Sequence, residues 1–495
     1  MIQIVVRDEM YAYDMYHMTK AFYPREKIEQ RVDTAYEKLI EITVEIHFGG
    51  EKRVEIKPEE VETIPERKLK KRYVNLKVYE EFSKFTNKEL AWGILTGVRP
   101  TKLMMGLIED GMTEKQITHW MKDNYRITDA KAELGIAVAK KEKELLEQLD
   151  YKDGYSLYIG IPFCPTTCSY CSFTSYPIAQ WKKRVDEYLD AVCKELSFIA
   201  SVSKKKKLNT IYIGGGTPTT LEPDQLDRLL THIEKHFCFD DLKEFTVEAG
   251  RPDSITREKL EVLKAHDISR ISINPQTMQQ KTLDLIGRRH TVEDVKRVYQ
   301  MAREVGFDNI NMDLIAGLPE ETVDDMRNTL EQIKVLAPDS LTVHALAMKR
   351  ASRLNQERKL NQEMKERQEE TEYTETARVL SEMIELAAKY ASDMDLLPYY
   401  LYRQKNIAGN FENVGYAKVD KAGIYNILIM EEKQSIVAVG AGASTKVVLP
   451  EGQAVIDEKT GNEKRIVRVE NVKDVEQYIS RIDEMIERKG ELLWH

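Results

Sequence analysis

The chain has 495 residues, of which 42% are hydrophobic and 32% charged, and its formal net charge is −9. This length is too great for one ordinary hydrophobic core, and the composition excludes a disordered chain or an integral membrane protein. The acidic balance argues against nucleic acid as the main partner. No apolar run is long enough to span a bilayer and the N-terminus does not resemble a signal peptide, so we expect a cytoplasmic protein without a membrane span.

Residues 1–150 carry the pattern of a separate α+β domain. A short apolar strand is expected at 2–6, and two strands at 41–48 and 53–57 flank the turn sequence Gly49-Gly50-Glu51-Lys52, which is typical of a hairpin. A helical stretch follows from about 78 to 149 and is interrupted at 97–102. No motif assigns a role to this domain.

Residues 151–350 alternate between short β-like runs and helical patterns. Strands are expected at 156–161, 210–213, 244–248, 270–274, 309–314 and 340–345, with helices near 180–200, 223–236, 256–265, 292–304 and 321–336. Such alternation predicts βα units with a parallel sheet, and right-handed crossovers would curl the six units into a barrel or part of one. Ligands bind at the carboxyl ends of the strands in such sheets, so we expect the functional site there.

Residues 351–495 form a third region. A highly charged helix is expected over about 353–392, with the charges on a solvated face. Hairpin-like strands follow at 424–430 and 436–439, and then the small-residue run Gly440-Ala441-Gly442-Ala443-Ser444. We therefore predict a C-terminal α+β extension.

The most informative motif is a set of three cysteines, Cys164, Cys168 and Cys171, on the loop after the first strand of the barrel region. Three thiolates at this spacing can ligate three irons of a cubane cluster and leave the fourth iron open. The alternatives are a zinc knuckle, which needs a fourth Cys or His close by, and cysteines that merely fill space. The two other cysteines, Cys193 and Cys238, lie in apolar surroundings and are expected to be buried packing residues.

Polar and glycine residues follow the neighbouring strands. The second strand ends in Gly214-Gly215-Gly216-Thr217, where glycines let the backbone approach a ligand and expose N–H groups. Glu248 ends the third strand and can accept hydrogen bonds from ribose hydroxyls, although a strand-end charge is the ordinary alternative. Asp313 lies in an apolar run, where burial without a partner is costly, so we expect a cation or a hydroxyl beside it.

The cysteine spacing resembles that of the radical S-adenosylmethionine (SAM) superfamily, in which SAM chelates the open iron and is cleaved by the reduced cluster to a 5′-deoxyadenosyl radical. The resemblance narrows, over about 190 residues, to the oxygen-independent coproporphyrinogen III oxidase-like branch. It rests on Tyr158, the three cysteines, the run GGGTPT, Glu248, Gln276, Arg288, Asp313 and Ala347. The N-terminal extension and residues 92–102 (WGILTGVRPTK) resemble those of HemZ-type members.

This resemblance implies a partial (β/α)6 radical SAM barrel over 151–350 and a role for each matching residue. Cys164, Cys168 and Cys171 would ligate a [4Fe-4S] cluster. The SAM bound to that cluster would be held by Tyr158, Gly215 and Glu248. An adjacent cavity, which holds a second SAM in the coproporphyrinogen enzyme, would be lined by Tyr170, Gly216, Thr217, Gln276, Arg288, Asp313 and Ala347.

The resemblance also implies a reaction, namely oxidative decarboxylation of the propionates of a tetrapyrrole to vinyl groups, as in coproporphyrinogen dehydrogenase. A reductase such as flavodoxin or ferredoxin would supply electrons, and the substrate would be coproporphyrinogen III or haem. Substrate carboxylates need cations, for which Arg288, Arg289 and Arg251 are the nearest candidates.

One departure from the pattern keeps other functions open. The decarboxylating enzyme has a fourth cysteine two positions beyond the third, where this chain has Phe173. Related haem-trafficking proteins carry Phe at that position, so a haem-binding or haem-delivery protein is one alternative. Another is a different radical SAM enzyme that modifies tetrapyrroles, such as one that degrades haem anaerobically. His344 would be an axial ligand in either, or a satisfied core histidine.

Overall fold

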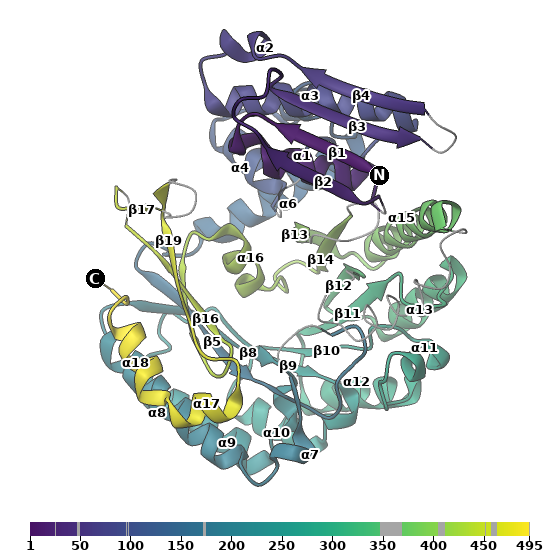
Figure 1. The fold of residues 1–495 in the computed structure, drawn as a ribbon. Helices are drawn as coiled ribbons and strands as arrows, with labels where there is room; N and C mark the ends of the chain where they lie inside the picture. The colour runs from purple at the N-terminus through teal and green to yellow at the C-terminus, as the bar shows by residue number, and fades with distance from the viewer. Residues whose placement is uncertain are drawn as a thin grey trace. The chain divides into compact units, whose positions relative to one another are not determined.

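A computed structural model of the protein describes every residue except 25, 47–49, 96, 98, 172–174, 347–368, 404–410, 451, 457–462 and 495. The chain forms two compact units. The first comprises residues 1–140, 365–381 and 401–413, and the second comprises residues 141–364, 382–400 and 414–495 (Figure 1). Each unit therefore combines segments that are distant in the sequence.

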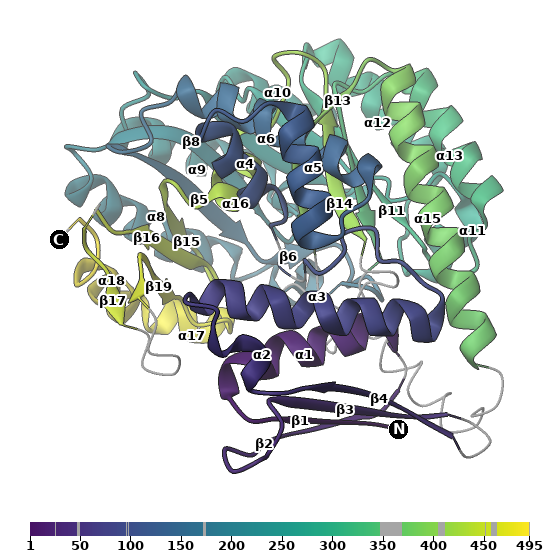
Figure 2. The same cartoon turned by 90° about the horizontal axis from the view of Figure 1, so that it is seen from above.

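The first unit contains a four-stranded sheet with the order β2-β1-β3-β4. Its strands are β1 (Ile2–Val6), β2 (Ile28–Val32), β3 (Ile40–Ile46) and β4 (Gly50–Ile56). The helices α1 (Glu9–Phe22) and α3 (Arg67–Thr86) cover one face of this sheet (Figure 2). Alternate residues of β1 are buried, as expected for a strand with one face on the core. The strand predicted at 2–6 and the antiparallel pair predicted around residue 50 are confirmed.

The remaining helices of the N-terminal segment are α2 (Glu59–Glu62), α4 (Thr101–Glu109), α5 (Glu114–Tyr125) and α6 (Asp129–Glu147). Within the first unit, Trp92 is buried and its indole nitrogen donates to a carboxylate oxygen of Glu412 at 2.8 Å. Lys131 forms an ion pair with the same carboxylate. Trp92 therefore anchors the returning segment 401–413, which gives the run 92–102 a structural role.

The second unit is built on a curved sheet in which six parallel strands follow one another in chain order. They are β5 (Gly154–Ile161), β8 (Lys207–Gly215), β9 (Glu244–Gly250), β10 (Arg270–Ile273), β11 (Ile310–Ala316) and β12 (Ser340–Ala345). The connecting helices lie along the convex face of the sheet (Figure 1). They include α8 (Val185–Val202), α9 (Pro223–His236), α10 (Arg257–Ala265), α12 (Val292–Val305) and α13 (Val323–Leu336). The predicted partial barrel is confirmed.

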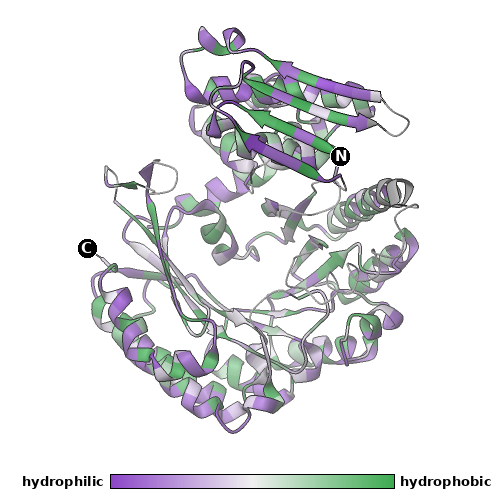
Figure 3. Cartoon of the chain, viewed as in Figure 1, coloured by the Kyte–Doolittle hydropathy of each residue, from purple (hydrophilic) through white to green (hydrophobic). Residues whose placement is uncertain are grey.

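Local sequence explains where these elements begin and end. The strands are buried on both faces, which accounts for their continuous apolar runs. The helix α12 begins with a capping box, in which the Thr291 hydroxyl accepts from the Asp294 N–H at 3.1 Å, and it ends at Gly306, whose φ is +102°. Helices are amphipathic, with hydrophobic and hydrophilic residues alternating around them (Figure 3). Because the six strands are parallel, their carboxyl ends lie at the same edge of the sheet.

Five further strands extend the sheet to eleven. Beyond β12 lie β14 (Glu412–Ala417) and β13 (Leu397–Arg403), and beyond β5 lie β15 (Ser435–Val439), β16 (Ser444–Val448) and β19 (Ile466–Glu470). The short elements are β6 (Phe163–Cys164), β7 (Tyr176–Pro177), α7 (Ile178–Trp181), α11 (Gln280–Leu285), β17 (Val455–Ile456), β18 (Glu463–Lys464), α17 (Val475–Ser480) and α18 (Ile482–Gly490), with 3-10 turns at Pro218–Thr220 and Pro252–Ser254. The strand predicted at 436–439 is confirmed.

The C-terminal region differs from the prediction at one segment and extends beyond the described residues at another. The strand predicted at 424–430 is wrong, because Ile424–Glu431 forms the helix α16 on the concave side of the sheet (Figure 1). Its apolar residues pack on the sheet, and the Ile424 N–H donates to Glu244 at 2.5 Å, so tertiary contacts override the local β preference. The helix α15 spans Glu369–Asp393, and the first part of the predicted charged helix, 353–368, lies outside the described residues.

The remaining cysteines behave differently from each other. Cys193 on α8 is buried, as predicted. Cys238 is exposed, so its predicted burial is wrong, because the neighbouring Phe237 takes the buried position at the end of α9. Among the residues that the structure describes, no helix has the length and hydrophobicity to cross a membrane.

A buried ion pair attaches the C-terminal helices to the barrel. Lys489 of α18 pairs with Glu195 of α8, and both side chains are inaccessible to solvent. Glu195 also accepts hydrogen bonds from the Asn471 amide at 3.0 Å and from the Tyr478 hydroxyl at 2.5 Å. Burial lowers the pKa of Lys489, and Glu195 opposes that effect. Each charge is therefore stabilised chiefly by polar partners inside the protein.

Removing one member of this pair should be strongly destabilising. Lys489→Met keeps a good helix former but leaves the Glu195 carboxylate buried without its cation, which should reduce the free energy of unfolding by about 3–5 kcal/mol. Urea unfolding of the variant and the parent measures the difference. The control is Lys194→Ala, which breaks an exposed pair with Asp483 and should change stability by at most about 1 kcal/mol. Equal losses in the two variants would contradict a dominant role for the buried pair.

Candidate active site

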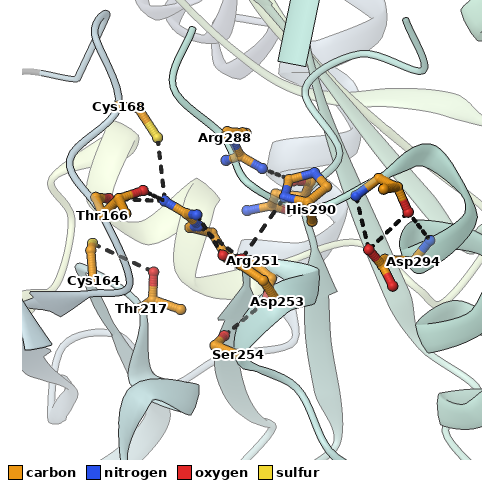
Figure 4. Close-up of polar contacts among 12 residues, drawn as sticks. Cys164, Thr166, Cys168, Thr217, Arg251, Asp253, Ser254, Arg288, His290 and Asp294 are labelled. Carbon is orange, nitrogen blue, oxygen red and sulfur yellow. Dashed lines mark hydrogen bonds and ion pairs between the residues drawn. The ribbon is translucent and has the colours of Figure 1, made fainter. Parts of the chain in front are cut away.

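The three cysteines lie on one loop that leaves the first barrel strand. Cys164 ends β6, and the Cys171 N–H donates to the Cys168 carbonyl at 3.2 Å, which forms a tight turn. The Ser169 N–H donates to the Ile286 carbonyl at 3.1 Å and fixes the loop to the segment after α11. None of the three cysteines forms a disulfide within the described residues, and all three are partly buried. Figure 4 shows the Cys164 sulfur directed at Thr217 and the Cys168 sulfur directed at Arg251.

The chemistry of these donors fits a [4Fe-4S] cluster. Within the described part of the chain, no three His, Cys, Asp or Glu side chains are arranged around a single metal position. A cubane does not require that arrangement, because each thiolate binds a different iron. Burial raises the pKa of the Cys164 thiol to about 11, so this thiol is protonated at neutral pH until a metal replaces the proton. Three cysteine thiols on one loop, none of them in a disulfide, are a suitable donor set.

The glycine run at the end of β8 packs directly against the cysteine segment. The Gly216 N–H donates to the Ile161 carbonyl at 2.8 Å, and a Cβ on Gly216 would lie 2.6 Å from the Phe163 carbonyl oxygen. Thr217 donates its N–H to that same oxygen at 2.7 Å and its hydroxyl to the Cys164 sulfur at 3.5 Å. Gly216 and Thr217 are therefore brought to the first cluster ligand, and only glycine fits this approach.

Three predicted residues, Tyr158, Gly215 and Glu248, come together at the same edge of the sheet. Gly215 has a φ of +106°, and a Cβ there would lie 3.1 Å from the Tyr158 hydroxyl. The Gly215 N–H and the Tyr212 hydroxyl both donate to the Glu248 carboxyl group. Burial raises the pKa of Glu248 to about 7, and the hydrogen bond from Tyr212 opposes this effect. Glu248 thus titrates near neutral pH.

The sequence analysis missed two aromatic residues beside Glu248. The rings of Tyr212 and Tyr425 stack at a centroid distance of 4.4 Å, and Tyr158 lies 6.2 Å from Tyr212 in a similar plane. Tyr212 is the register partner of Tyr158 on the adjacent parallel strand. It lies two residues before Gly214, and residues two apart in a strand share a face, so the sequence pattern could have identified it. Tyr425 belongs to the segment that was expected to be a strand, and no sequence signal identified it.

Three further predicted residues come from different segments, since Gln276 follows β10, Arg288 follows α11 and Tyr170 lies on the cysteine loop itself. Arg288 is buried and donates to the Asn274 carbonyl at 2.5 Å and to the Tyr170 hydroxyl at 3.2 Å. Gln276 has a φ of +69°, and its N–H donates to the Asp313 carbonyl at 2.9 Å. These contacts join the ends of β10 and β11 to the cysteine loop.

Asp313 has the hydroxyl partner that was expected, because the Thr342 side chain hydrogen-bonds to its carboxyl group, and it has two further polar partners. An amide of Asn311 donates to its carboxylate at 2.7 Å, and the His344 ring nitrogen lies 3.9 Å away. Burial alone would raise the pKa of Asp313, but His344 and Asn311 outweigh it, and the pKa is lowered. His344 therefore stands beside a carboxylate, which agrees better with a satisfied histidine than with an axial ligand.

Several buried polar atoms at this edge have no hydrogen-bond partner among the residues that the structure describes. They are Gln276 Oε1, Asn274 Oδ1, Ser272 Oγ and Arg288 Nε. Native proteins satisfy most buried polar groups, so a cluster of unsatisfied ones indicates a place for a polar ligand. Ala347 and Phe173 lie outside the described residues, and the expectations for them stay predictions.

The three candidate cations for substrate carboxylates differ in availability. Arg288 and Arg251 are buried and already bonded to protein groups. Arg289 is exposed and lines a cavity of about 470 Å³ with Thr167 and Asp284, beside the cysteine loop. Arg288 also lines this cavity, but Arg289 is the exposed cation of the three.

Comparisons with known proteins agree with this geometry. Residues 158–333 match the sequence model of the radical SAM superfamily. The chain is 41% identical, over 84% of its length and 79% of the relative, to the oxygen-independent coproporphyrinogen-III oxidase-like protein HemZ of Bacillus subtilis (strain 168). The chain belongs to this radical SAM family. Members of the superfamily use a [4Fe-4S] cluster and SAM, and the chain is a radical SAM enzyme of the coproporphyrinogen oxidase-like type.

More distant radical SAM relatives match shorter parts. The heme chaperone HemW of Bacillus subtilis is 39% identical over 39% of this chain and 51% of its own length. The oxygen-independent coproporphyrinogen III oxidase of Escherichia coli (strain K12) is 32% identical over 38% of this chain and 41% of its own. The solved structure of coproporphyrinogen III oxidase (HemN) from Escherichia coli shares the fold, with a TM-score of 0.50 and 20% identity over 70% of this chain and 73% of that one.

The raised pKa of Glu248 predicts an unusual effect of Glu248→Gln in the ligand-free protein. The carboxyl group ionises near pH 4.5 when unfolded and near 7 when folded, so its ionisation destabilises the fold increasingly as the pH rises from 4.5 to 7. The variant should be more stable than the parent at pH 8 by on the order of 1–3 kcal/mol, since the site is partly open to solvent.

Chemical unfolding at pH 8 and pH 5 tests this effect, because the difference should narrow as the pH is lowered. The same variant should bind SAM about ten- to a hundredfold more weakly, since a charged hydrogen-bond acceptor is lost. A stability difference independent of pH would mean that the Glu248 carboxyl group titrates normally.

Proposed function

We propose that this protein uses a [4Fe-4S] cluster held by Cys164, Cys168 and Cys171 to cleave SAM and to act on a tetrapyrrole. The reaction would resemble that of oxygen-independent coproporphyrinogen III oxidase. One observation carries the proposal, namely that the Thr217 hydroxyl at the end of β8 contacts the Cys164 sulfur at the carboxyl edge of the sheet. Glycine-rich and cysteine segments, distant in sequence, meet there as a SAM-cleaving site requires.

The residues of the chain would bind and orient the cofactors. A [4Fe-4S] cluster held by Cys164, Cys168 and Cys171 would supply the one-electron chemistry, and the chain would position SAM and the substrate beside it. Glu248 would accept hydrogen bonds from the ribose hydroxyls of the SAM, and Gly215 would present backbone to it. The stacked rings of Tyr158, Tyr212 and Tyr425 would close one side of the site against water.

A second SAM would occupy the adjacent cavity, which would be lined by Tyr170, Gly216, Thr217, Gln276, Arg288, Asp313 and Ala347. The unsatisfied buried atoms of Gln276 and Arg288 support this proposal. The tetrapyrrole would present carboxylates to the exposed Arg289. Electrons would come from a flavodoxin- or ferredoxin-type reductase in the cytoplasm.

We also propose that the regions 1–150, 151–350 and 351–495 have different roles, because every proposed cluster and SAM ligand lies in 151–350, whereas the last region contributes only Tyr425 to the wall of the site. Phe173 stands where the decarboxylating enzyme has a cysteine, which favours a haem-binding or haem-trafficking role as the second candidate. The 39% identity to a heme chaperone is in line with that candidate. A radical SAM enzyme that modifies another tetrapyrrole is the third.

The cluster assignment predicts the iron content of the protein. Anaerobically purified protein should carry about four irons per chain, and replacing Cys164, Cys168 and Cys171 together by Ala should abolish iron binding, because these thiols are the only proposed ligands. Iron analysis and the visible absorption of the cluster measure this. Cys193→Ser and Cys238→Ser are the matched controls and should retain full iron. Stoichiometric zinc, or full iron in the triple variant, would refute the assignment.

A second prediction separates the enzyme from the carrier. With dithionite, the protein should cleave SAM to 5′-deoxyadenosine, and an enzyme should do so faster when its tetrapyrrole is present, because bound substrate traps the radical. A carrier should bind haem with no effect on cleavage. Conversion of coproporphyrinogen III should be poor, since Phe173 supplies bulk and no thiol. Product analysis by mass spectrometry reads all three results.

Variants of the proposed cavity sharpen this test. Asp313→Asn and Arg288→Ala should abolish the stimulation by substrate while leaving the iron content unchanged. Arg297→Ala breaks an exposed ion pair on α12 and should preserve the stimulation. Efficient formation of the divinyl product would contradict the inference from Phe173, and the absence of any tetrapyrrole effect would remove this substrate class from the proposal.

A further inference from the structure

Arg251, just after β9, has a position that the proposed function does not use. Its side chain is 3% exposed. One terminal nitrogen donates to the Thr166 carbonyl at 2.9 Å and to the Thr166 hydroxyl at 2.7 Å, and it lies 3.9 Å from the Cys168 sulfur. The other two nitrogens donate to the two carboxylate oxygens of Asp253, at 2.9 and 2.6 Å (Figure 4).

This arrangement excludes Arg251 as a clamp for substrate carboxylates. The guanidinium is buried, one edge is occupied by Asp253, and the other faces the cysteine loop. The sequence builds the pair locally, because Pro252 starts a short 3-10 turn that returns Asp253 to the arginine. The Ser254 hydroxyl closes the turn by donating to the Arg251 carbonyl at 2.7 Å.

We propose that Arg251 is a positioning residue of the cluster site, which fixes the turn from Thr166 to Cys168 and raises the reduction potential of the cluster through its contact with the Cys168 sulfur. The inference rests on the proposed function, since it requires Cys168 to be a cluster ligand. Reduction adds negative charge to the cluster, so hydrogen bonds and positive charge at a ligand sulfur favour the reduced form.

The surroundings make the charge of Arg251 effective. Buried charges are screened far less than exposed ones, and the guanidinium stands in direct contact with the ligand atom. Asp253 offsets part of that charge. His290, whose ring nitrogen lies 3.8 Å from Asp253, is buried, and burial and then Arg288 lower its pKa to about 4, so it adds no charge at pH 7. Arg288 is a second buried cation that interacts with Cys168.

Two substitutions at this pair should shift the potential in opposite directions. Arg251→Gln removes the positive charge but retains polar N–H groups. It should lower the equilibrium constant for reduction of the cluster at least tenfold, which corresponds to a midpoint potential lower by about 59 mV for one electron. Asp253→Asn leaves the guanidinium without its counter-charge, so it should raise the potential. Arg251→Lys keeps the charge and should recover most of the parent value. Midpoint potentials are measured by redox titration of the full-length, cluster-loaded protein followed by electron paramagnetic resonance, without SAM.

Iron content is measured on every sample. Arg257→Gln, which removes an exposed arginine paired with Glu304, is the matched control and should leave the potential unchanged. An unchanged potential in Arg251→Gln at full iron content overturns the proposal. If Arg251→Gln loads iron poorly, the midpoint potential of Asp253→Asn tests the proposal in its place. An unchanged or lowered potential in Asp253→Asn overturns the proposal. A parent protein that binds no cluster at all refutes the proposed function itself, which is a separate result.

Discussion

The candidate site depends on the backbone contact between the end of β8 and the segment that leads to the cysteines. Two consecutive N–H groups, those of Gly216 and Thr217, donate to the Ile161 and Phe163 carbonyls. A side chain on Gly216 would collide with that segment. Because this contact fixes the Cys164 side of the loop to the sheet, the glycine run serves the cluster loop as well as any ligand. The neighbouring residues Tyr158, Gly215 and Glu248 lie at the same edge of the sheet.

Near this junction, the local surroundings set the pKa values of two buried carboxyl groups. Glu248 is held near its titration point by burial, whereas Asp313 is kept ionised by His344 and Asn311. Two carboxyl groups on adjacent parts of one edge therefore differ in protonation, which is how a single fold can offer both an adjustable and a fixed acceptor. Arg288 connects Tyr170 on the cysteine loop to the Asn274 carbonyl, so the cavity and the cluster loop are mechanically joined.

The sequence was sufficient to predict the parallel strands and the place of the three cysteines on the loop after the first of them, because continuous apolar runs, capping residues and glycines at turns are local signals. It failed where long-range packing decides. The segment at 424–431 has a strong β preference, yet it is helical because Tyr425 stacks on Tyr212 and the Ile424 N–H meets Glu244. Arg251 looked like a free cation, since nothing local shows that Thr166, 85 residues away, occupies its donors.

The unsatisfied atoms and the raised pKa of Glu248 have a common physical consequence. Each destabilises the protein when the site holds no ligand, because buried polar groups are costly without partners. A ligand that supplies those partners binds the folded state alone and stabilises it by mass action. The buried pair of Glu195 and Lys489, with its further hydrogen bonds, lies on α8 and α18 and offers a fixed support that does not change with ligand. The pair of Glu195 and Lys489 thus stabilises the folded state with or without ligand, whereas the carboxyl edge becomes more stable only when it binds a ligand.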